Sequence, residues 1–221
     1  LYDRLFPVRH RYERVDDVLV RVSAVQVRTL PALLVRPHRV LRRFQARQDL
    51  ANEGELLLGR IDTPDGWELL APHWSTVHEA TPGASVFQTY DYLRTWWQCL
   101  GSAGELLIVP VLRDGALIAI APLQITGVKQ LGAPVRTISF IGQPSESDRP
   151  TLLGEPDEAT CGALADYLLS LKRHWRSIVL FEQPVDSTLV RVLRERLRRQ
   201  HYLTAQIPGN ECPYIDIKGT W

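Results

Sequence analysis

The chain has 221 residues, of which 45% are hydrophobic and 23% charged, and its formal net charge is +1. This length and composition are typical of a globular protein with one large domain, or with one domain and an extension. The near-zero charge gives no general argument for a nucleic acid or an anionic surface as partner. No apolar run approaches the roughly 20 residues of a membrane-spanning helix, so no membrane span is predicted.

Cysteine and histidine spacing gives no sign of a metal site. Cys99, Cys161 and Cys212 are widely separated and form no C-x-x-C pair, whereas a zinc site requires clustered thiolates and imidazoles. His73 and His78 lie outside the i, i+4 spacing of a helical metal-binding pair. The first residues, LYDRLFPVRHRYERVDD, lack the sustained apolar core of a secretory signal. We therefore expect free thiols, no bound metal and a cytoplasmic location.

The N-terminal segment differs in charge from the rest of the chain. Residues 1–60 hold 12 Lys and Arg against 7 Asp and Glu, a balance of +5, whereas residues 61–221 hold 14 against 18, a balance of −4. The segment is either a solvated basic extension or an arm that contacts phosphates. Aromatic residues, which single-stranded nucleic acid binding favours, are scarce in it. We therefore expect residues 1–53 to be a poorly ordered or partly helical extension, and we do not expect nucleic acid binding.

Regular patterning begins at residue 54. The run ELLLGRID (55–62) has the length of a strand and ends in a turn-rich Thr-Pro-Asp-Gly stretch. Trp67, Leu70, Trp74 and Val77 follow at spacings of 3, 4 and 3, which is the spacing of one face of a helix. The sequence therefore predicts a strand and then a helix over residues 67–78.

Residues 86–101, VFQTYDYLRTWWQCLG, contain five aromatic residues within eleven positions. Thr89 can cap a helix here and Gly101 can end it. Apolar side chains cover well over half of its circumference, which is typical of a helix enclosed by other elements. We therefore predict that Trp97 belongs to the core. The alternative is a ligand-stacking site, and Trp96 could reach a groove because tryptophan is seldom fully buried.

The clearest local signal is a β-hairpin. The runs ELLIVPVL and ALIAIAPLQI flank Arg113-Asp114-Gly115, and two apolar runs joined by an Asp-Gly turn indicate paired antiparallel strands. Successive positions of both runs are apolar, so we predict a sheet covered on both sides. A third strand, VRTISFIG (135–142), follows the stretch GVKQLGAP (127–134), which we predict to be a loop.

After residue 142 a polar loop leads into alternating helices and strands. The first helix carries its apolar residues on one face: Cys161, Leu164, Leu168, Leu171 and Trp175. Cys161 is therefore predicted to be a buried thiol and not a nucleophile. A strand is predicted at SIVLF (177–181), and Ser187 can cap a second helix with an arginine-rich solvated face. YLTAQI (202–207) and PYIDI (213–217) are predicted to be strands.

The predicted element order from residue 54 is β-α-α-β-β-β-α-β-α-β-β. This order excludes a Rossmann fold, and it contains too few β-α units for a barrel. We therefore predict an α+β fold in which a central mixed or antiparallel sheet has helices on both faces, preceded by the irregular extension.

Three segments together resemble a known family: FQTYDYLRTWW (87–97), LLIVPVLRDGALIAIAPL (106–123) and ISFIGQPSESD (138–148) followed by a helix. In order and spacing they resemble the acetyltransferase-like domain of CelD-type cellulose-biosynthesis proteins. That family belongs to the GNAT superfamily and is related to the FemAB transferases. The resemblance covers about residues 54–221 and implies a GNAT-like domain there.

The resemblance also implies an activity. Such a transferase moves an acyl group from acetyl-CoA or another acyl-CoA to an amine or hydroxyl, here of a polysaccharide or cell-envelope acceptor. Members often carry two GNAT-like halves, so we expect residues 54–221 to be the N-terminal half, with a second GNAT-like half in the same polypeptide. A small molecule or a glycan is the expected acceptor. The alternative is a non-catalytic GNAT-like module that binds the acceptor or a partner and scaffolds a catalytic half.

The expected donor-binding loop departs from the pattern of the superfamily. GNAT enzymes hold the pyrophosphate of coenzyme A with a loop of the type (Gln/Arg)-x-x-Gly-x-(Gly/Ala), which follows the fourth strand and opens a helix. Here residues 143–148 read QPSESD, in which a proline lacks an N–H and two carboxylates repel phosphate. The nearest formal match, QITGVK (124–129), fails at its last position. We therefore expect no tight binding of acetyl-CoA by this chain alone.

The same polar loop supplies the candidate site residues. Asp148 matches an acidic position common after this strand in the family, and with Arg149 it could contact an acceptor, while Trp96 could form a wall of the site. The alternative for Asp148 is a solvated loop carboxylate or a helix-start contact. Glu146 is a further acid in the loop, and the sequence contains no G-x-S-x-G elbow. The sequence thus predicts Asp148, Arg149 and Trp96 as substrate-binding residues and identifies no catalytic residue.

Overall fold

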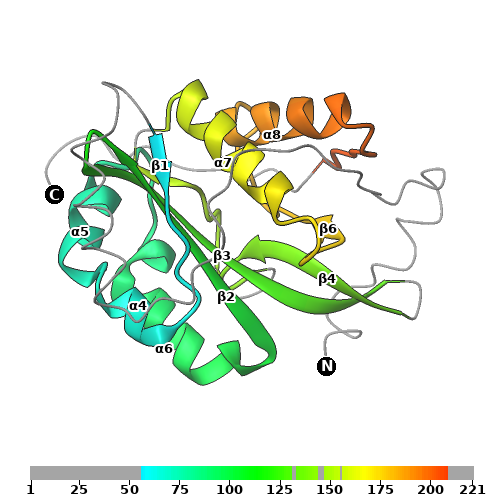
Figure 1. Ribbon diagram of the computed structural model, residues 1–221. Helices are drawn as coiled ribbons and strands as arrows, with labels where there is room; N and C mark the ends of the chain where they lie inside the picture. Colours follow the sequence, from blue (N-terminus) through cyan, green and yellow to red (C-terminus); the bar gives the residue numbers. More distant parts are fainter. Residues whose placement is uncertain (1–55, 131–132, 144–146, 155, 209–221) are drawn as a thin grey trace, which may run out of the picture.

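A computed structural model describes residues 56–130, 133–143, 147–154 and 156–208 of the protein (Figure 1). The predicted basic extension of residues 1–53, the predicted strand at 213–217 and Glu146 lie outside these described residues. Within them, no helix is long and apolar enough to cross a membrane.

The described strands form one mixed sheet. They are β1 (Leu56–Leu58), β2 (Gly104–Arg113), β3 (Ala116–Gln130), β4 (Ala133–Phe140), β5 (Leu153–Gly154) and β6 (Ser177–Ile178). Their order is β1-β2-β3-β4-β6, and β5 pairs with β3 outside this path. Every pair is antiparallel except β4 and β6, which are parallel. The predicted sheet is thereby confirmed.

The central hairpin forms as the sequence predicts. Strands β2 and β3 pair from Gly104 opposite Thr126 to Arg113 opposite Ala116. Asp114 and Gly115 form the turn with φ angles of 49° and 78°. Two consecutive positive φ angles match the tight hairpin turn that Asp-Gly favours, because its twist suits the flanking strands.

Three expectations about the strands are wrong. The predicted loop at 127–134 is largely strand, because β3 and β4 continue their ladder with Val128 opposite Val135. Its glycine and proline suggested a turn, but Gly127 has open space around it and Pro134 lies near the end of the ladder. The strand predicted at 177–181 pairs over two residues only, and residues 202–207 form no strand in the described chain.

Five α-helices cover the sheet in the described part of the chain: α4 (Pro64–Glu68), α5 (Ala71–Glu79), α6 (Tyr90–Leu100), α7 (Glu158–Ser170) and α8 (Thr188–Arg199). Short 3-10 turns, η1 (Val86–Gln88) and η2 (Gly101–Ala103), flank α6. The side chains of Thr63, Thr89, Asp157 and Ser187 accept hydrogen bonds at the starts of four of the helices, which satisfies N–H groups that the helix leaves free. The single helix predicted at 67–78 is divided between α4 and α5.

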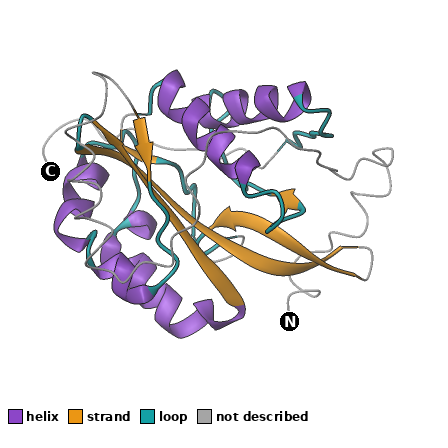
Figure 2. Ribbon diagram, viewed as in Figure 1, coloured by secondary structure: helices purple, strands orange, loops and turns teal. Residues whose placement is uncertain are grey.

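The helices lie in two layers, with α7 and α8 on one face of the sheet and α4, α5 and α6 on the other (Figures 1 and 2). Alternate residues of β2 serve the two layers. Leu107, Val109 and Val111 join the core under α7 and α8. Leu106 and Ile108 join the core under α4 to α6. This alternation of side chains across a strand explains why the hairpin sequence is apolar at successive positions.

The buried tryptophans are not those of the WW pair. Trp67, Trp74 and Trp175 are 0 to 1% exposed. Trp97 and Trp96 are half-buried and pack at the margin of the α4–α6 core, and the end of α6 is open, with Leu100 55% exposed. The prediction of an enclosed helix with Trp97 in the core is therefore wrong.

The Trp97 ring packs at the connection between α6 and β2. A Cβ on Gly101 would lie 2.5 Å from the Trp97 ring, so that ring packs on the glycine at the end of its own helix. Helix α6 therefore has apolar side chains around most of its circumference and is still partly exposed.

Candidate functional site at the open end of the parallel strands

The candidate functional site lies at the carboxyl ends of the parallel strands β4 and β6. In open parallel α/β sheets, ligands bind in the crevice outside the carboxyl ends of the strands, where the connections leave in different directions. Strands β4 and β6 pair through Thr137 with Ser177 and through Ile138 with Ile178. The Val179 N–H still donates to the Ile138 carbonyl at 2.9 Å. Two residues later the main-chain ladder has been replaced by a side chain.

That side chain is Gln143. Its Nε2 donates to the Phe181 carbonyl at 2.8 Å, and the Phe181 N–H donates to its Oε1 at 3.3 Å. Gln143 is 7% exposed. A side-chain carboxamide therefore fills the position between the strand ends where a neighbouring strand would otherwise pair.

A short segment, residues 147–151, passes beside this position, and we call it the strap. Gln88, in η1 before α6, donates from Nε2 to the Thr151 carbonyl at 2.8 Å. Gln183, after β6, donates from Nε2 to the Pro150 carbonyl at 2.6 Å. Two glutamines from opposite sides thus hold consecutive carbonyls of the strap.

The strap and the chain after β6 both contain strained backbone. Arg149 has φ 44° and Glu182 has φ 53°. Left-handed φ values are costly for residues with a side chain and concentrate at functional sites. The two residues are also joined, because the Arg149 N–H donates to the Glu182 Oε2 at 3.2 Å. The strain thus lies on both sides of the open strand ends.

Buried polar atoms without a partner concentrate in the same region. In the described part of the chain, the unpartnered atoms there are Oε1 of Gln88, Gln124 and Gln183 and Oγ of Ser147. Gly142 has φ 84°, and a Cβ on it would lie 2.8 Å from the Ser147 Cβ, so a larger residue does not fit there. Each carboxamide uses its nitrogen on a carbonyl, so its oxygen is the free atom and can accept a further hydrogen bond. The region therefore offers acceptors to a ligand or to water.

The structure brings together two of the three predicted site residues. Asp148 and Arg149 are adjacent on the exposed strap, with Arg149 Nε 3.8 Å from Asp148 Oδ2. Both side chains are more than half exposed, so this ion pair adds little stability. Trp96 packs with the α4–α6 core, whereas the strap contacts residues before α6, namely Ser85 and Gln88.

Carboxylate side chains of the protein occupy the N-terminus of α7, where an anion could otherwise bind. The Asp157 carboxylate accepts from the Thr160 N–H at 2.7 Å and pairs with Arg113 at 2.6 Å. Hydrogen bonds from the Thr160 hydroxyl and N–H, with Arg113 adding to them, lower the pKa of Asp157 to about 2. Glu158 adds a second carboxylate in the first turn. A bare helix start attracts anions, but here two carboxylates occupy it, each paired with an arginine: Asp157 with Arg113 and Glu158 with Arg191.

The other formal donor-loop match is excluded by its position. Residues 124–129 lie within β3, paired with β2 up to Thr126 and with β4 throughout. Their main-chain N–H and C=O groups form the hydrogen bonds of the sheet, so they are not available to surround a phosphate.

A small cavity of about 150 Å³ lies between α5 and the start of α6, lined by Trp74, Ser75, His78, Glu79, Thr89 and Tyr90. The imidazole Nε2 of His78 lies 2.9 Å from the Ser85 carbonyl and must donate to it. The Ser85 hydroxyl in turn donates to the Asp148 carbonyl at 3.4 Å. The cavity is therefore linked to the strap through Ser85.

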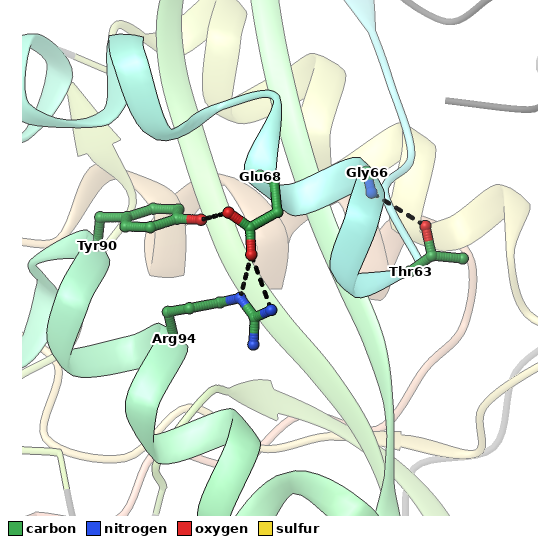
Figure 3. A network of polar contacts seen from close by, with 5 residues as sticks. All are labelled: Thr63, Gly66, Glu68, Tyr90 and Arg94. Carbon is green, nitrogen blue, oxygen red and sulfur yellow. Dashed lines mark hydrogen bonds and ion pairs between the residues drawn. The ribbon is translucent and has the colours of Figure 1, made fainter. Parts of the chain in front are cut away.

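One wall of this cavity is fixed by a polar network between α4 and α6 (Figure 3). Glu68 accepts from Arg94 at 2.8 and 3.1 Å and from the Tyr90 hydroxyl at 3.1 Å. These bonds, from Arg94 first and then Tyr90, lower the pKa of Glu68, while burial and Glu68 raise the pKa of Tyr90. The Tyr90 hydroxyl is thereby turned to Glu68.

Neither a metal cluster nor a reactive thiol marks this region. The described residues contain no group of three or more His, Cys, Asp or Glu side chains that could hold a metal ion. Cys161 is fully buried, and burial raises the pKa of its thiol to about 11. Its prediction as a buried thiol is confirmed.

Comparisons with known proteins give limited information. No model of a protein family matches the chain, and no curated protein matches it. A solved structure titled ribosomal-protein-alanine N-acetyltransferase, from Brucella melitensis biovar Abortus 2308, shares 14% identity with a TM-score of 0.41, over 72% of this chain and 99% of that one. Aminoglycoside N-acetyltransferase AAC(6')-Iy, solved in complex with CoA, shares 12% identity with a TM-score of 0.41, over 74% and 99%. Both TM-scores lie below 0.5, so neither likeness assigns an activity to this chain.

Sequence reasoning missed the glutamines. Gln143 stands at the first position of the expected phosphate loop, and no local pattern marks Gln88 or Gln183. The strap is held by contacts between residues far apart in the chain, such as Gln88 with Thr151. Their single-sequence context gave no signal of this role.

Proposed function

We propose that this chain is a GNAT-type acyltransferase module that forms the acceptor side of the reaction and lacks a donor-binding loop. The observation that supports this most is the β4–α7–β6 unit. It places one parallel strand pair in an otherwise antiparallel sheet and leaves their carboxyl ends apart. The element order and this unit agree with the arrangement that the sequence resemblance implies.

The proposed reaction is the transfer of an acyl group from an acyl-CoA thioester to an amine or hydroxyl of a polysaccharide or cell-envelope acceptor. A second GNAT-like half of the same polypeptide supplies the donor site in this proposal. Asp148 and Arg149 on the strap, with the acceptor oxygens of the nearby glutamines, are the groups proposed to contact the acceptor.

A second candidate is a non-catalytic module that binds the acceptor or a partner and scaffolds a catalytic half. The specific observation in its favour is the closed start of α7, where Asp157 and Glu158 oppose an anion. Both candidates predict that this chain alone binds acetyl-CoA weakly or not at all.

Calorimetry with acetyl-CoA tests this shared expectation. We expect no stoichiometric micromolar binding to the chain. Asp157→Ser combined with Glu158→Ala keeps a capping hydroxyl, removes both charges and frees Arg113, so it should increase the affinity for coenzyme A. Micromolar binding to the unmodified chain, lost on changing residues 143–149, would show that the donor site lies here after all.

Transfer by a longer polypeptide separates the two candidates. A polypeptide that joins this chain to the proposed second half should release free thiol from acetyl-CoA when glucosamine or a cello-oligosaccharide is added. Asp148→Asn with Arg149→Gln should raise the KM for the acceptor if this half binds it for catalysis. Unchanged kinetics would favour the scaffold.

A further inference from the structure

Most of the positive charges in the described chain are paired with carboxylates. The described residues include 14 Lys and Arg side chains, of which eight form ion pairs. The arginine-rich face of α8 is largely neutralised in this way, since Arg191 pairs with Glu158 and Arg196 with Asp166. The cations without a carboxylate partner among the described residues are Lys129, Lys172, Arg173, Arg176, Arg194 and Arg198.

Helices α7 and α8 run in the same direction, so their C-terminal ends lie together (Figure 1). Glu158 at the start of α7 pairs with Arg191 near the start of α8, and Asp166 pairs with Arg196 further along both helices. Beyond the two helices, the rings of Trp175 and Tyr202 stack with their centroids 6.3 Å apart. Residues 172–176 and the last turn of α8 therefore share one end of this layer.

The unpaired cations gather at that end. Arg173 and Arg176 are exposed on either side of the buried Trp175, Lys172 is half-buried, and Arg198 lies in the last turn of α8. Basic residues are favourable at a helix C-terminus, but this effect is confined to the last turn. Because α7 ends at residue 170, the helix dipole does not account for Arg173 and Arg176.

The ribbon formed by β3 and β4 adds Lys129 to the same end. Arg136 of β4 donates from Nε to the His174 carbonyl at 2.6 Å, which ties the ribbon to the connection between α7 and β6. Gly127 lies opposite Arg136, and the exposed Lys129 follows two residues later on the same side of β3. We use the name basic end for the group Lys129, Lys172, Arg173, Arg176 and Arg198.

An exposed apolar segment lies beside the basic end. Residues 203–207 follow the stacked Tyr202 and form neither helix nor strand. The side chains of Thr204 and Gln206 accept hydrogen bonds from Arg198 and Arg194 of α8. Their apolar neighbours are left outside, with Leu203 44% and Ile207 55% exposed.

The combination of charge and apolar side chains indicates the kind of partner. An anionic bilayer offers phosphates to basic side chains and hydrocarbon to exposed apolar ones, whereas a soluble polyanion offers only the charges. Single-stranded nucleic acids also favour exposed aromatic rings, but Trp175 and Tyr202 are buried at this end. An anionic lipid surface therefore fits the observed groups best.

We propose that the basic end, together with Leu203 and Ile207, docks the protein on the surface of an anionic bilayer. The lysine and arginine side chains contact lipid phosphates, and the two apolar side chains enter the boundary between headgroups and acyl chains. This docking surface lies outside the strap and the cavity beside α5, and it goes beyond the proposed function without depending on it.

Cosedimentation of the chain with vesicles tests the docking surface. We expect binding to phosphatidylcholine vesicles that contain about 30% phosphatidylglycerol, and no binding to phosphatidylcholine alone. Arg173→Gln with Arg176→Gln should weaken binding about twentyfold, since each basic residue near an anionic surface contributes about fivefold. The matched control, Arg113→Gln with Arg191→Gln, removes the same charge at the start of α7 and should weaken binding less than about threefold.

A second pair of variants tests the apolar contribution. Leu203→Ser with Ile207→Ser leaves the charge unchanged and should weaken vesicle binding about fivefold or more, because apolar area stays in water. Its weak binding to dextran sulfate, a soluble polyanion, should not change. All the exchanged side chains reach solvent, and thermal melts confirm that the variants fold.

Three results would overturn the docking surface: equal binding to both kinds of vesicle, an equal loss in the control variant, or full vesicle binding by the serine variant. The last result, together with tight binding of dextran sulfate or duplex DNA, would assign the basic end to a soluble polyanion. Acyl transfer is not part of these measurements, so the docking surface and the proposed function can fail separately.

Discussion

The two faces of the sheet differ in how many buried polar atoms lack a hydrogen-bond partner. Within β3, Leu123 and Ile125 point into the core under α7 and α8, which is made of apolar residues. Gln124, between them, points to the opposite face. On that face, Trp67, Gln88, Trp96 and Gln124 each have a buried polar atom without a hydrogen-bond partner in the described chain. Helix α8 contributes Arg194 Nε, and Arg60 Nε, after β1, lies 3.2 Å from Asp62 Oδ2.

This difference suggests separate roles in stability and in ligand binding for the two faces of the sheet. A buried polar atom without a partner costs about 1–3 kcal/mol, so such atoms are rare unless something else uses them. The α7–α8 face is suited to stability, and the α4–α6 face, which adjoins the strap, retains groups that a ligand or water can satisfy. The predictions below, in order of expected effect, test this division.

The largest effect is expected at Trp175, on the α7–α8 face. This residue is 1% exposed, and its Nε1 donates to the Leu168 carbonyl at 2.8 Å. Trp175→Ala should lower the free energy of unfolding by about 3–5 kcal/mol, since it creates a large cavity. Denaturant unfolding at pH 7 measures this. A loss below about 1 kcal/mol would be typical of a surface site and would contradict the packing described here.

Trp97 should be markedly less important than Trp175. Because Trp97 is half-buried on the α4–α6 side, Trp97→Ala should cost about 1–2 kcal/mol, near the ordinary range for single substitutions. The same denaturant experiment compares the two variants directly. Equal losses would mean that α6 is enclosed after all, as its sequence suggested.

Gln124 tests whether the polar face is tuned for stability. Gln124→Leu removes a free Oε1 and also the Nε2 bonds to the Phe140 carbonyl and the Ser139 hydroxyl, at 3.2 and 3.4 Å. These changes oppose each other, so the net change in unfolding free energy should stay within about 1 kcal/mol. Gln124→Glu is the matched control and should be clearly worse because it buries a charge. A large loss in the leucine variant would show that the amide is needed for the fold.

The smallest effect concerns pH and Asp157. Its pKa of about 2 in the folded protein lies below the ordinary 3.8, so the stabilisation is complete above pH 3.8 and is lost as the pH falls towards 2. Asp157→Asn preserves the cap and removes the charge. Because the side chain is 47% exposed, solvent screening limits the difference at pH 7 to about 0.5–1 kcal/mol. Thermal melts of both forms should converge near pH 2, and a constant gap would argue against an ionic origin.

Sequence reasoning found what depends on neighbours along the chain. The Asp-Gly turn, the caps at Thr89 and Ser187 and the apolar stripe through Cys161 are local patterns, and the structure confirms them. The pattern also predicted correctly that the hairpin strands are covered on both sides.

Prediction from the sequence failed for features that depend on contacts between residues far apart in the chain. The length of the β3–β4 ladder depends on the pairing of the two strands, which overrides the turn signals of Gly127 and Pro134. Trp97 packs at Gly101 and Gly104, in the connection from α6 to β2, and the apolar pattern of α6 alone does not reveal this. The candidate site was found in part, because Asp148 and Arg149 lie on the strap, but the glutamines that hold it act across the fold.

The parallel strand pair also has a consequence for the order of folding. The β2–β3 hairpin joins residues close in sequence, with Leu112 opposite Leu117, whereas Thr137 meets Ser177 across 40 residues and a whole helix. Closing the longer loop costs more chain entropy, so the parallel pair should form after the hairpin. Contacts that form late with few paired residues also open most readily in the native state. The Phe181 amide should therefore exchange its hydrogen with solvent well before the hairpin amides, while the rest of the sheet stays folded.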